Sequence, residues 1–312
     1  MKRHCLLLIV LGLLAFGKAS AQYDASFSHY WMMEPSFNPA AVGKESKLNV
    51  NAAYNHGFTG FENNPKTMYA GADMPFYFIG AYHGAGVQFL NDQIGLFRHT
   101  RFALQYAYKH KLLGGMLSVG LQAAMLSETF DGSGLDLEDS SDPAFSSSEV
   151  EGSGFDLAAG LFYTHRNWWA GASVQHALAP VIELGETNEI ELDRTYYLTG
   201  GCNIRLRSPF LTIHPSVLAR TDLTAWRVDI TGRVKYTNDK KVMYVGATYS
   251  PTTSVTVMVG GMVHGISLGY SYEMYTSTLS VGNGSHELCV GYQTDLNLYK
   301  KGRNKHKSVR FL

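Results

Sequence analysis

The chain has 312 residues, 45% of them hydrophobic, and its 26 basic and 26 acidic side chains leave no net formal charge. That hydrophobic content is too low for a bundle of membrane helices, and the balanced charge leaves no basic footprint for a nucleic acid. Glycine (32), tyrosine (19) and phenylalanine (16) are abundant while proline (9) is scarce, which favours an all-β chain of one large or two small domains.

Residues 1–21 have the pattern of a signal peptide. A basic start is followed by an apolar run and then by an A-x-A cleavage site at Ala19 and Ala21. The run is too short to span a bilayer as a helix, and Cys5 is in the wrong place for a lipoprotein. We therefore expect the mature chain to begin at Gln22, outside the cytoplasm.

Residues 22–45, which we call the leader, contain the segment NPAAVG. Pro39 fixes its own φ and disfavours the helical region for Asn38, while Gly43 can adopt a positive φ. The segment therefore predicts a rigid turn. The leader also carries four aromatic side chains that predict packing against another surface, because an exposed disordered segment rarely carries so many: Phe27, Tyr30, Trp31 and Phe37.

From residue 46 onward, strands of about ten residues alternate apolar and polar side chains. In the stretch near residue 270, Leu268 and Tyr270 share one face, and Ser267 and Ser271 share the other. The polar face is mostly small and uncharged along the chain, and the apolar face is rich in aromatic residues near strand ends. Both features are typical of a transmembrane antiparallel up-and-down β-barrel with a polar lumen and aromatic girdles.

The alternation predicts about fourteen strands, an even number, in a barrel over residues 46–298. Connections after even-numbered strands are short, and several after odd-numbered strands are long, as expected for periplasmic turns and external loops. Both chain ends then lie in the periplasm. The strands are expected near residues 46–55, 66–75, 79–90, 98–109, 115–127, 153–164, 168–178, 194–206, 210–219, 224–236, 241–250, 253–262, 264–275 and 285–297.

In the periplasm, NPAAVG is expected to close the mouth of the barrel or to offer a docking surface. A simple strand-initiating turn is an equal alternative. The aromatic leader would either plug the lumen or bind a partner.

Two charged segments flank or interrupt the barrel. Residues 128–151 contain eight acidic and no basic side chains, which favours a solvated external loop, with calcium-assisted contact to a partner as the alternative. Residues 299–312 are basic, and this periplasmic tail is either solvated or meets an acidic partner or anionic headgroups. Cys202 and Cys289 are expected as small apolar residues, although one bridge is geometrically possible.

The stretch GNGSHELCVGY invites a catalytic or metal-binding interpretation, which the strand period disfavours. Ser285 and His286 are adjacent, so they point to opposite faces and cannot act as nucleophile and base. We expect His286 in the outer interfacial belt and Glu287 at the barrel mouth, paired with an Arg or Lys of a neighbouring strand. We therefore expect no enzyme activity and no cofactor or metal.

Three segments resemble one known family in the right order. The opening of the mature chain, with NPAAVG, resembles that of the PorP/SprF family of type IX secretion system membrane proteins, although Val42 stands where the family more often has Ala. Residues 214–220 resemble its xPSxLxK/R strand, and residues 268–288 resemble its stretch ending in GSHEI. The matching residues that we expect to serve partner docking are Asn38, Pro39, Ala40, Gly43, Pro215, Ser216, Ser285, His286 and Glu287.

The resemblance implies a fourteen-stranded outer-membrane barrel of a Bacteroidetes-type bacterium that takes part in protein export and gliding. Its partners would be outer-membrane lipid and either periplasmic, peptidoglycan-linked machine subunits or a secreted surface adhesin. A porin-like channel or small-molecule transporter is the alternative, and a lipid-modifying enzyme is disfavoured. Within the strand, Pro215 lacks a ladder donor, which predicts a bulge or a broken rung where a partner strand could bind.

Overall fold

In the computed structural model, the stretches that alternate apolar and polar residues form β-strands. The structure describes residues 24–132, 149–185, 188–239, 241–276 and 283–296. The signal peptide, the basic tail and most of the acidic loop lie outside these residues. The barrel strands are β1 (Lys47–His56), β2 (Lys66–Phe78), β3 (Ala81–Ile94), β4 (Phe97–Leu112), β5 (Gly115–Asp131), β6 (Glu149–Thr164), β7 (Trp168–Gln175), β10 (Thr195–Cys202) with its continuation β11 (Ile204–Arg205), β12 (Leu211–Thr221), β13 (Trp226–Asn238), β14 (Lys241–Ser250), β15 (Ser254–Val263), β16 (Ile266–Tyr275) and β17 (Ser285–Asp295).

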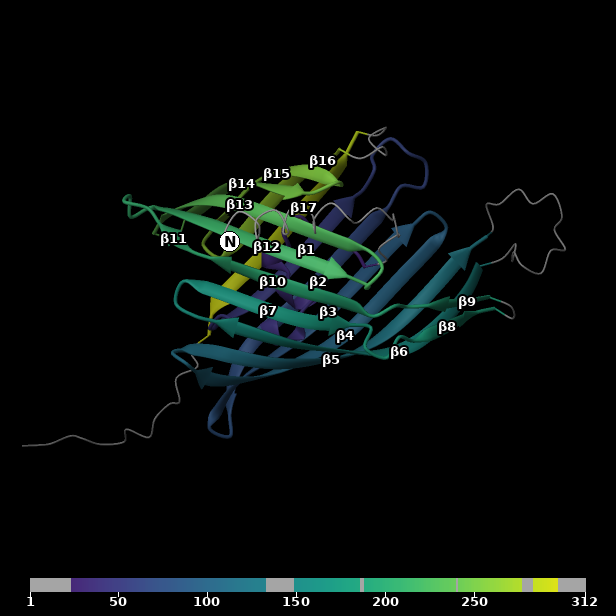
Figure 1. Cartoon of the computed structure of the whole chain (residues 1–312), viewed down its shortest axis with the longest axis horizontal. Coiled ribbons are helices and arrows are strands. Elements are labelled where there is room, and N and C mark those ends of the chain that lie inside the picture. Colours follow the sequence, from purple (N-terminus) through teal and green to yellow (C-terminus); the bar gives the residue numbers. More distant parts are fainter. Residues whose placement is uncertain (1–23, 133–148, 186–187, 240, 277–282, 297–312) are drawn as a thin grey trace, which may run out of the picture.

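These strands form a closed antiparallel barrel of fourteen strands, which confirms the predicted fold (Figure 1). Each strand pairs with its neighbours along the chain, and β1 pairs with β17 from Lys47↔Asp295 to His56↔His286 to close the ring. Closure leaves the sheet without a free edge strand, which suits a hydrocarbon environment.

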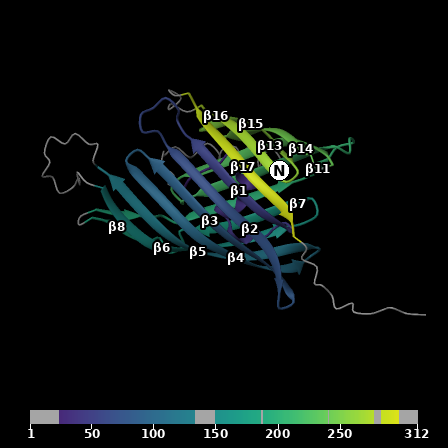
Figure 2. The same cartoon turned by 180° about the vertical axis from the view of Figure 1, so that it is seen from behind.

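The two faces of the barrel differ as the alternation predicts. On β16, Leu268 is 57% exposed on the outside, whereas Ser271 is 1% exposed in the lumen. The outer face carries many exposed large apolar side chains, a surface suited to lipid. They come from strands all around the ring, which Figures 1 and 2 show from opposite sides. No helix among the described residues is long and apolar enough to cross a membrane.

Short turns gather at one end of the barrel, which we call the short-turn end. The β2–β3 and β4–β5 turns place both central residues at positive φ: Ile79 (44°) with Gly80 (78°), and Leu113 (48°) with Gly114 (77°). This left-handed pair matches the twist of two antiparallel strands and allows a two-residue connection. The first residue of β1 and the last of β17 lie at the same end, because Lys47 pairs with Asp295.

The opposite end carries a hairpin that the sequence analysis did not predict, formed by β8 (Val181–Leu184) and β9 (Asn188–Glu191) (Figure 1). It lies within a segment expected to be an external loop. Ile182 is fully buried and packs with Leu126 of the barrel wall. This burial of apolar surface stabilises a hairpin that would be marginal in isolation.

Pro215 interrupts one ladder without shifting it. On one side β12 pairs with β10 up to Ser216↔Gly201, and the pairing resumes with β11 at Ile204↔Ile213 in the same register. The feature is therefore a broken rung and not a bulge, because a bulge adds a residue to one strand. On the other side, Pro215 stays in register opposite Gly232 of β13.

Candidate functional site

The leader lies inside the barrel lumen. Its described part, from residue 24, folds into three short 3-10 turns, η1 (Tyr30–Met32), η2 (Glu34–Ser36) and η3 (Pro39–Ala41), before β1 begins. This location differs from the expected periplasmic position and matches the alternative in which the leader plugs the lumen. The physical reason is complementarity, because its aromatic rings and polar groups find partners on the lumen wall.

The NPAAVG segment has the local conformation that its residue types predict. Asn38 is extended (φ −137°, ψ 105°), and its side-chain oxygen accepts a hydrogen bond from the backbone N–H of Ala40 at 2.9 Å. Pro39 occupies the first position of η3, where no backbone donor is needed. Gly43 has φ +60°, and its N–H donates to the Asp73 carboxylate of β2 at 2.8 Å.

The NPAAVG segment is deeply buried against the inner wall of the barrel. Asn38 is 1% exposed, and its amide also donates to the backbone carbonyl of Leu161 on β6 at 3.0 Å. Gly120 of β5 allows close approach, since a Cβ built there would lie 2.2 Å from the nitrogen of Ala40. The segment is therefore fitted closely to the wall.

Glu287 joins the closing strand to the leader. Its carboxylate accepts hydrogen bonds from the backbone N–H groups of Ser28 (2.6 Å) and His29 (2.9 Å), and it pairs with Nδ1 of His29 at 2.7 Å. The expected partner, an Arg or Lys of a neighbouring strand, was wrong. A basic side chain is available from the leader because the leader fills the lumen beside β17.

The same location brings together three groups of the kinds that bind metals. His29, Glu287 and Cys289 are all buried, and their ligand atoms lie within 4.8 Å of one another. However, Nδ1 of His29 and the Glu287 carboxylate already satisfy each other, and the carboxylate takes two further backbone hydrogen bonds. We therefore interpret the cluster as an anchor for the leader. Cys202 and Cys289 are both free.

Asp24 forms a second anchor at the beginning of the described leader. Its carboxylate accepts a hydrogen bond from the Tyr197 hydroxyl of β10 at 2.5 Å and lies 3.1 Å from Nε2 of His176, whose Nδ1 lies 2.9 Å from Asp156. Burial alone would raise the pKa of Asp24, but the positive charges of His176 and Arg101 lower this pKa well below its usual range. Asp24 is therefore held as an anion.

Lumen-facing polar side chains also satisfy the leader's backbone. Gln105 donates to the carbonyl oxygen of Pro35 at 2.6 Å, and Ser173 donates to that of Phe37 at 2.6 Å. The hydroxyl of Tyr30 lies 2.7 Å from that of Ser216, which gives this predicted site residue a contact with the leader. Such partners are needed because an unpaired buried backbone group is costly.

The two remaining predicted residues of the closing strand, Ser285 and His286, face opposite sides of the barrel wall. Ser285 faces inward, where its hydroxyl accepts a hydrogen bond from the Phe58 N–H at 3.0 Å and contacts the Tyr275 hydroxyl at 2.6 Å. His286 faces outward and pairs through Nδ1 with the Tyr270 hydroxyl at 2.7 Å. The structure therefore does not bring Ser285 and His286 together as nucleophile and base.

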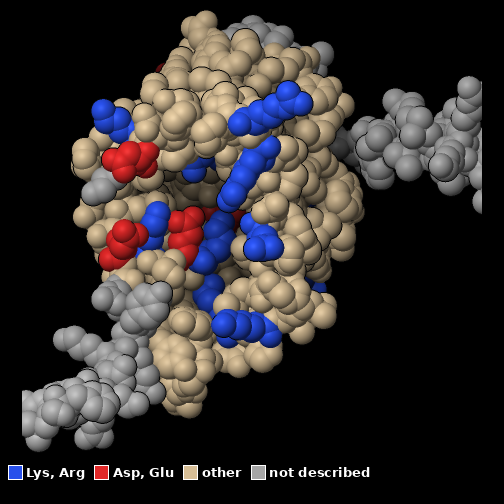
Figure 3. Space-filling model, turned by 90° about the vertical axis from the view of Figure 1, so that its left-hand side faces the viewer, with Lys and Arg blue, Asp and Glu red and all other residues tan. Residues whose placement is uncertain are grey.

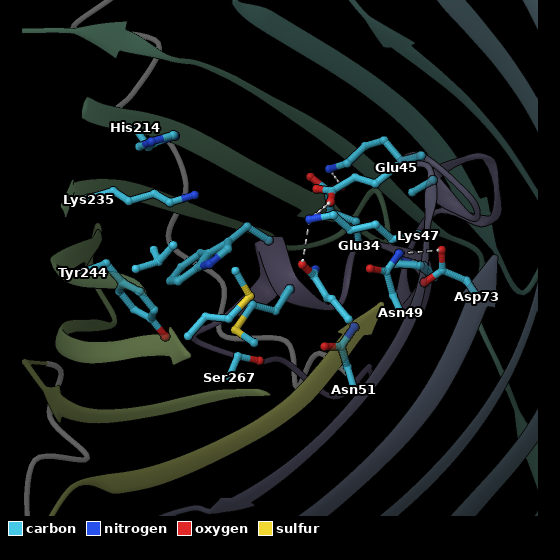
Figure 4. Close-up of a pocket in the computed structure, with 18 of the residues that line it drawn as sticks. Glu34, Glu45, Lys47, Asn49, Asn51, Asp73, His214, Lys235, Tyr244 and Ser267 are labelled. Carbon is cyan, nitrogen blue, oxygen red and sulfur yellow. Dashed lines mark hydrogen bonds and ion pairs between the residues drawn. The ribbon is translucent and has the colours of Figure 1, made fainter. Parts of the chain in front are cut away.

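The short-turn end opens into a cavity of about 260 Å³, which we call the entrance cavity (Figures 3 and 4). Lysine, arginine and acidic side chains surround the hollow at this end of the molecule (Figure 3). Its lining comes from the leader and from the inner faces of β1, β2 and β12–β17: Trp31, Met32, Glu34, Pro35, Ala41, Lys44, Glu45, Lys47, Asn49, Asn51, Asp73, His214, Arg233, Lys235, Val242, Tyr244, Gly261, Met262, Ser267 and Gln293.

Sequence reasoning missed Asp24 and His29 as anchors of the leader, and it missed the basic residues of β13 as part of a cavity wall. A partial signal exists, because Arg233 and Lys235 share the predicted lumen face, and His29 lies within the aromatic leader. What the sequence lacks is the position of the leader. Without it, no strand residue has an identifiable partner on the leader.

Comparisons with known proteins agree with this architecture. The sequence model of one family, described as "Type IX secretion system membrane protein PorP/SprF", matches residues 19–292. No curated protein matches the sequence. Among solved structures, a monoaromatic hydrocarbon channel, CymD, superposes with a TM-score of 0.51 at 12% identity, covering 88% of this chain and 95% of its own. A FadL homologue from Pseudomonas aeruginosa gives a TM-score of 0.45 at 10% identity, with coverages of 84% and 93%.

Proposed function

The chain belongs to the PorP/SprF family of type IX secretion system membrane proteins, and from this we propose that it helps to export or anchor a cell-surface protein. The observation that carries the proposal is the extent of the family match, which spans the leader and nearly all of the barrel. In this proposal the protein is a non-enzymatic component of the outer membrane that docks to periplasmic subunits of the secretion machine or to a secreted surface adhesin.

The filled lumen supports this role over that of an open porin. The leader occupies the interior through two carboxylate anchors, Asp24 and Glu287, and through close contact between Ala40 and Gly120. A general diffusion channel needs an open polar lumen. The similarity to CymD concerns the fold, and the channel activity named for that protein is not carried over to this chain.

We further propose that the short-turn end and both termini face the periplasm. Short periplasmic turns and longer external loops are the usual asymmetry of bacterial barrels. The basic tail of residues 299–312 and the entrance cavity would then face the same compartment as the periplasmic subunits. Docking would use this end, while the buried NPAAVG segment would hold the leader in place.

Deletion of the chain in its native bacterium tests the proposal. We expect a surface protein to be lost from the outer membrane or released into the medium, and the full-length chain to restore it. Affinity purification of the tagged protein from outer membranes should recover that surface protein or periplasmic machine subunits. Unchanged surface and secreted protein profiles, together with steady solute flux through the purified barrel, would instead establish the channel alternative.

A further inference from the structure

One wall of the entrance cavity carries positive charge that no acidic side chain contacts directly within the described chain. Arg233 and Lys235 lie on the lumen face of β13, two residues apart. Within the described chain, neither side chain forms an ion pair or a hydrogen bond with another residue. The Arg233 guanidinium lies 3.8 Å from the centre of the Trp31 ring, which supports one of its faces and leaves its N–H groups unused.

Three hydrogen-bonding atoms on this wall also lack partners. Nε2 of His214, Nε of Arg233 and the hydroxyl oxygen of Tyr244 are buried and make no hydrogen bond in the described structure. Each of these atoms can donate a hydrogen bond. The arginine always can, the tyrosine does so through its hydroxyl, and the histidine does so in the tautomer with hydrogen on Nε2. Buried donors without acceptors are rare and costly, so three of them in the lining of one cavity mark a wall that is short of acceptors.

The strand register places these groups side by side. His214 of β12 pairs directly with Arg233 of β13, and Lys235 of β13 pairs directly with Tyr244 of β14. Directly opposite residues have Cβ atoms about 5 Å apart. Arg233 and Lys235 are successive lumen-facing residues of β13, so the two pairs are neighbours on the cavity wall. His214, Lys235 and Tyr244 lie together on one side of the cavity (Figure 4).

The acidic side chains of the cavity are engaged elsewhere. Glu34 pairs with Lys44, and Glu45 lies 3.7 Å from Lys47. Asp73 accepts hydrogen bonds from the leader backbone and from a neighbouring amide. Glu34, Glu45 and Asp73 lie across the cavity from the wall of β12–β14 (Figure 4). Glu34 and Glu45 therefore act on Arg233 and Lys235 only from a distance, and no described acid forms an ion pair with the positive wall.

We propose that the entrance cavity binds an oxyanion, a carboxylate or a phosphate group, against His214, Arg233, Lys235 and Tyr244. An oxyanion accepts several hydrogen bonds at once, and charge-assisted bonds to arginine and lysine are the strongest of them. The 260 Å³ cavity is smaller than a typical drug-sized pocket and suits one small anion or one acidic side chain. This anion site does not depend on the proposed role in secretion, because it is argued only from the residues that line one side of the entrance cavity.

Titration calorimetry on the purified full-length barrel in detergent tests the site. The probes are inorganic phosphate, succinate and a hexaglutamate peptide, each in a chloride-matched buffer. We expect saturable binding of at least one probe, weakened by added salt. The double variant Arg233→Gln with Lys235→Gln should lose about tenfold or more in affinity, and Tyr244→Phe should lose several-fold.

The matched control is Arg205→Gln with Lys241→Gln, which removes the same two charges from exposed positions at the same end of the barrel and outside the cavity lining. It should keep the full affinity. Tight binding of phosphate or succinate identifies a free small anion as the ligand, and binding of the peptide alone identifies an acidic polypeptide segment.

The proposal is overturned if the unmodified protein shows no saturable binding of any probe, or if the double variant binds with equal affinity. Folding is checked by the heat-dependent shift in gel mobility that intact barrels show. Should the double variant fail to fold, the conservative Tyr244→Phe variant decides the question, and an unchanged affinity there overturns the site.

Discussion

At the residue scale, the carboxylate of Glu287 takes its shortest hydrogen bonds from the leader, and the Cys289 thiol of its own strand adds a longer one at 3.4 Å. Two backbone N–H groups and the His29 ring converge on it, and both side chains are at most 1% exposed. Removing one partner of a buried pair leaves the other uncompensated, which is more damaging than replacing both. Glu287 and His29 therefore form a coupled pair, although 258 residues separate them in the chain.

We expect Glu287→Gln to loosen the leader while the barrel remains closed around it. The loss of charge at a buried pair costs about 3 kcal/mol, which increases the population of the released leader about a hundredfold. Limited proteolysis of the purified protein measures this as faster cleavage within residues 24–45. Glu62→Gln, at an exposed loop position, is the control, and equal cleavage rates in the two variants would contradict the anchoring role.

Asp24, the second anchor of the leader, can be tested by substitution in the same way. We expect Asp24→Asn to leave Tyr197 and His176 with a weaker acceptor and to release the beginning of the leader first. Neutralising both Asp24 and Glu287 should speed cleavage more than either change alone, because the two anchors hold different parts of one segment. Hydrogen exchange of the leader amides, read by mass spectrometry, reports both effects. Unchanged exchange in the double variant would exclude these carboxylates as anchors.

At the element scale, the fit between η3 and the barrel wall depends on small residues. Any side chain at Gly120 of β5 would collide with the leader backbone at Ala40, at 2.2 Å. Backbone cannot yield as a flexible side-chain end can, so the leader or the strand has to move. Gly120 thus serves the leader and not the strand itself, in which a larger side chain would be favoured.

We expect Gly120→Ala to displace η3 and to expose the leader to protease, with a destabilisation of about 1–3 kcal/mol from overpacking. Gly232→Ala is the matched control, because a Cβ at Gly232 of β13 meets no atom within 4 Å. Both variants replace a strand glycine by alanine, so they share any effect on strand propensity. Cleavage of the leader at the same rate in both would show that the close approach does not hold it.

At the scale of the whole molecule, the barrel is closed around its own N-terminal segment. The leader is anchored at Asp24 near one part of the ring and at Glu287 on the strand that closes it. The hairpin of β8 and β9 packs against the wall at the other end through Ile182. The lumen is therefore partly filled, with the entrance cavity left at the short-turn end.

Deletion of residues 24–43 should convert this closed barrel into a conducting one. Planar bilayers carrying the unmodified protein are expected to show little steady current, whereas the deleted form should show stable openings, since nothing else described fills the same volume. Deletion of residues 299–312 serves as the control and should leave conductance low. A steady current of similar size in the unmodified protein would show that the leader does not obstruct the lumen.

The sequence by itself determined the barrel. Period-two alternation, as in Leu268 and Tyr270 opposite Ser267 and Ser271, fixed the number of strands and the face of each side chain. The conformations of Asn38 and Gly43 followed from local chemistry, because proline and glycine restrict or free the backbone wherever they occur.

Only the tertiary structure decided where the leader lies and what it contacts. The partner of Glu287, the fit of Ala40 on Gly120 and the hairpin of β8 and β9 depend on which surfaces meet in space. Alternation records the face on which a side chain lies, but it carries no information about a partner more than a hundred residues away. The positive wall of β12–β14 shows the same division. The alternation places Arg233 and Lys235 on the lumen face, but only the closed barrel shows that no described acid contacts them directly.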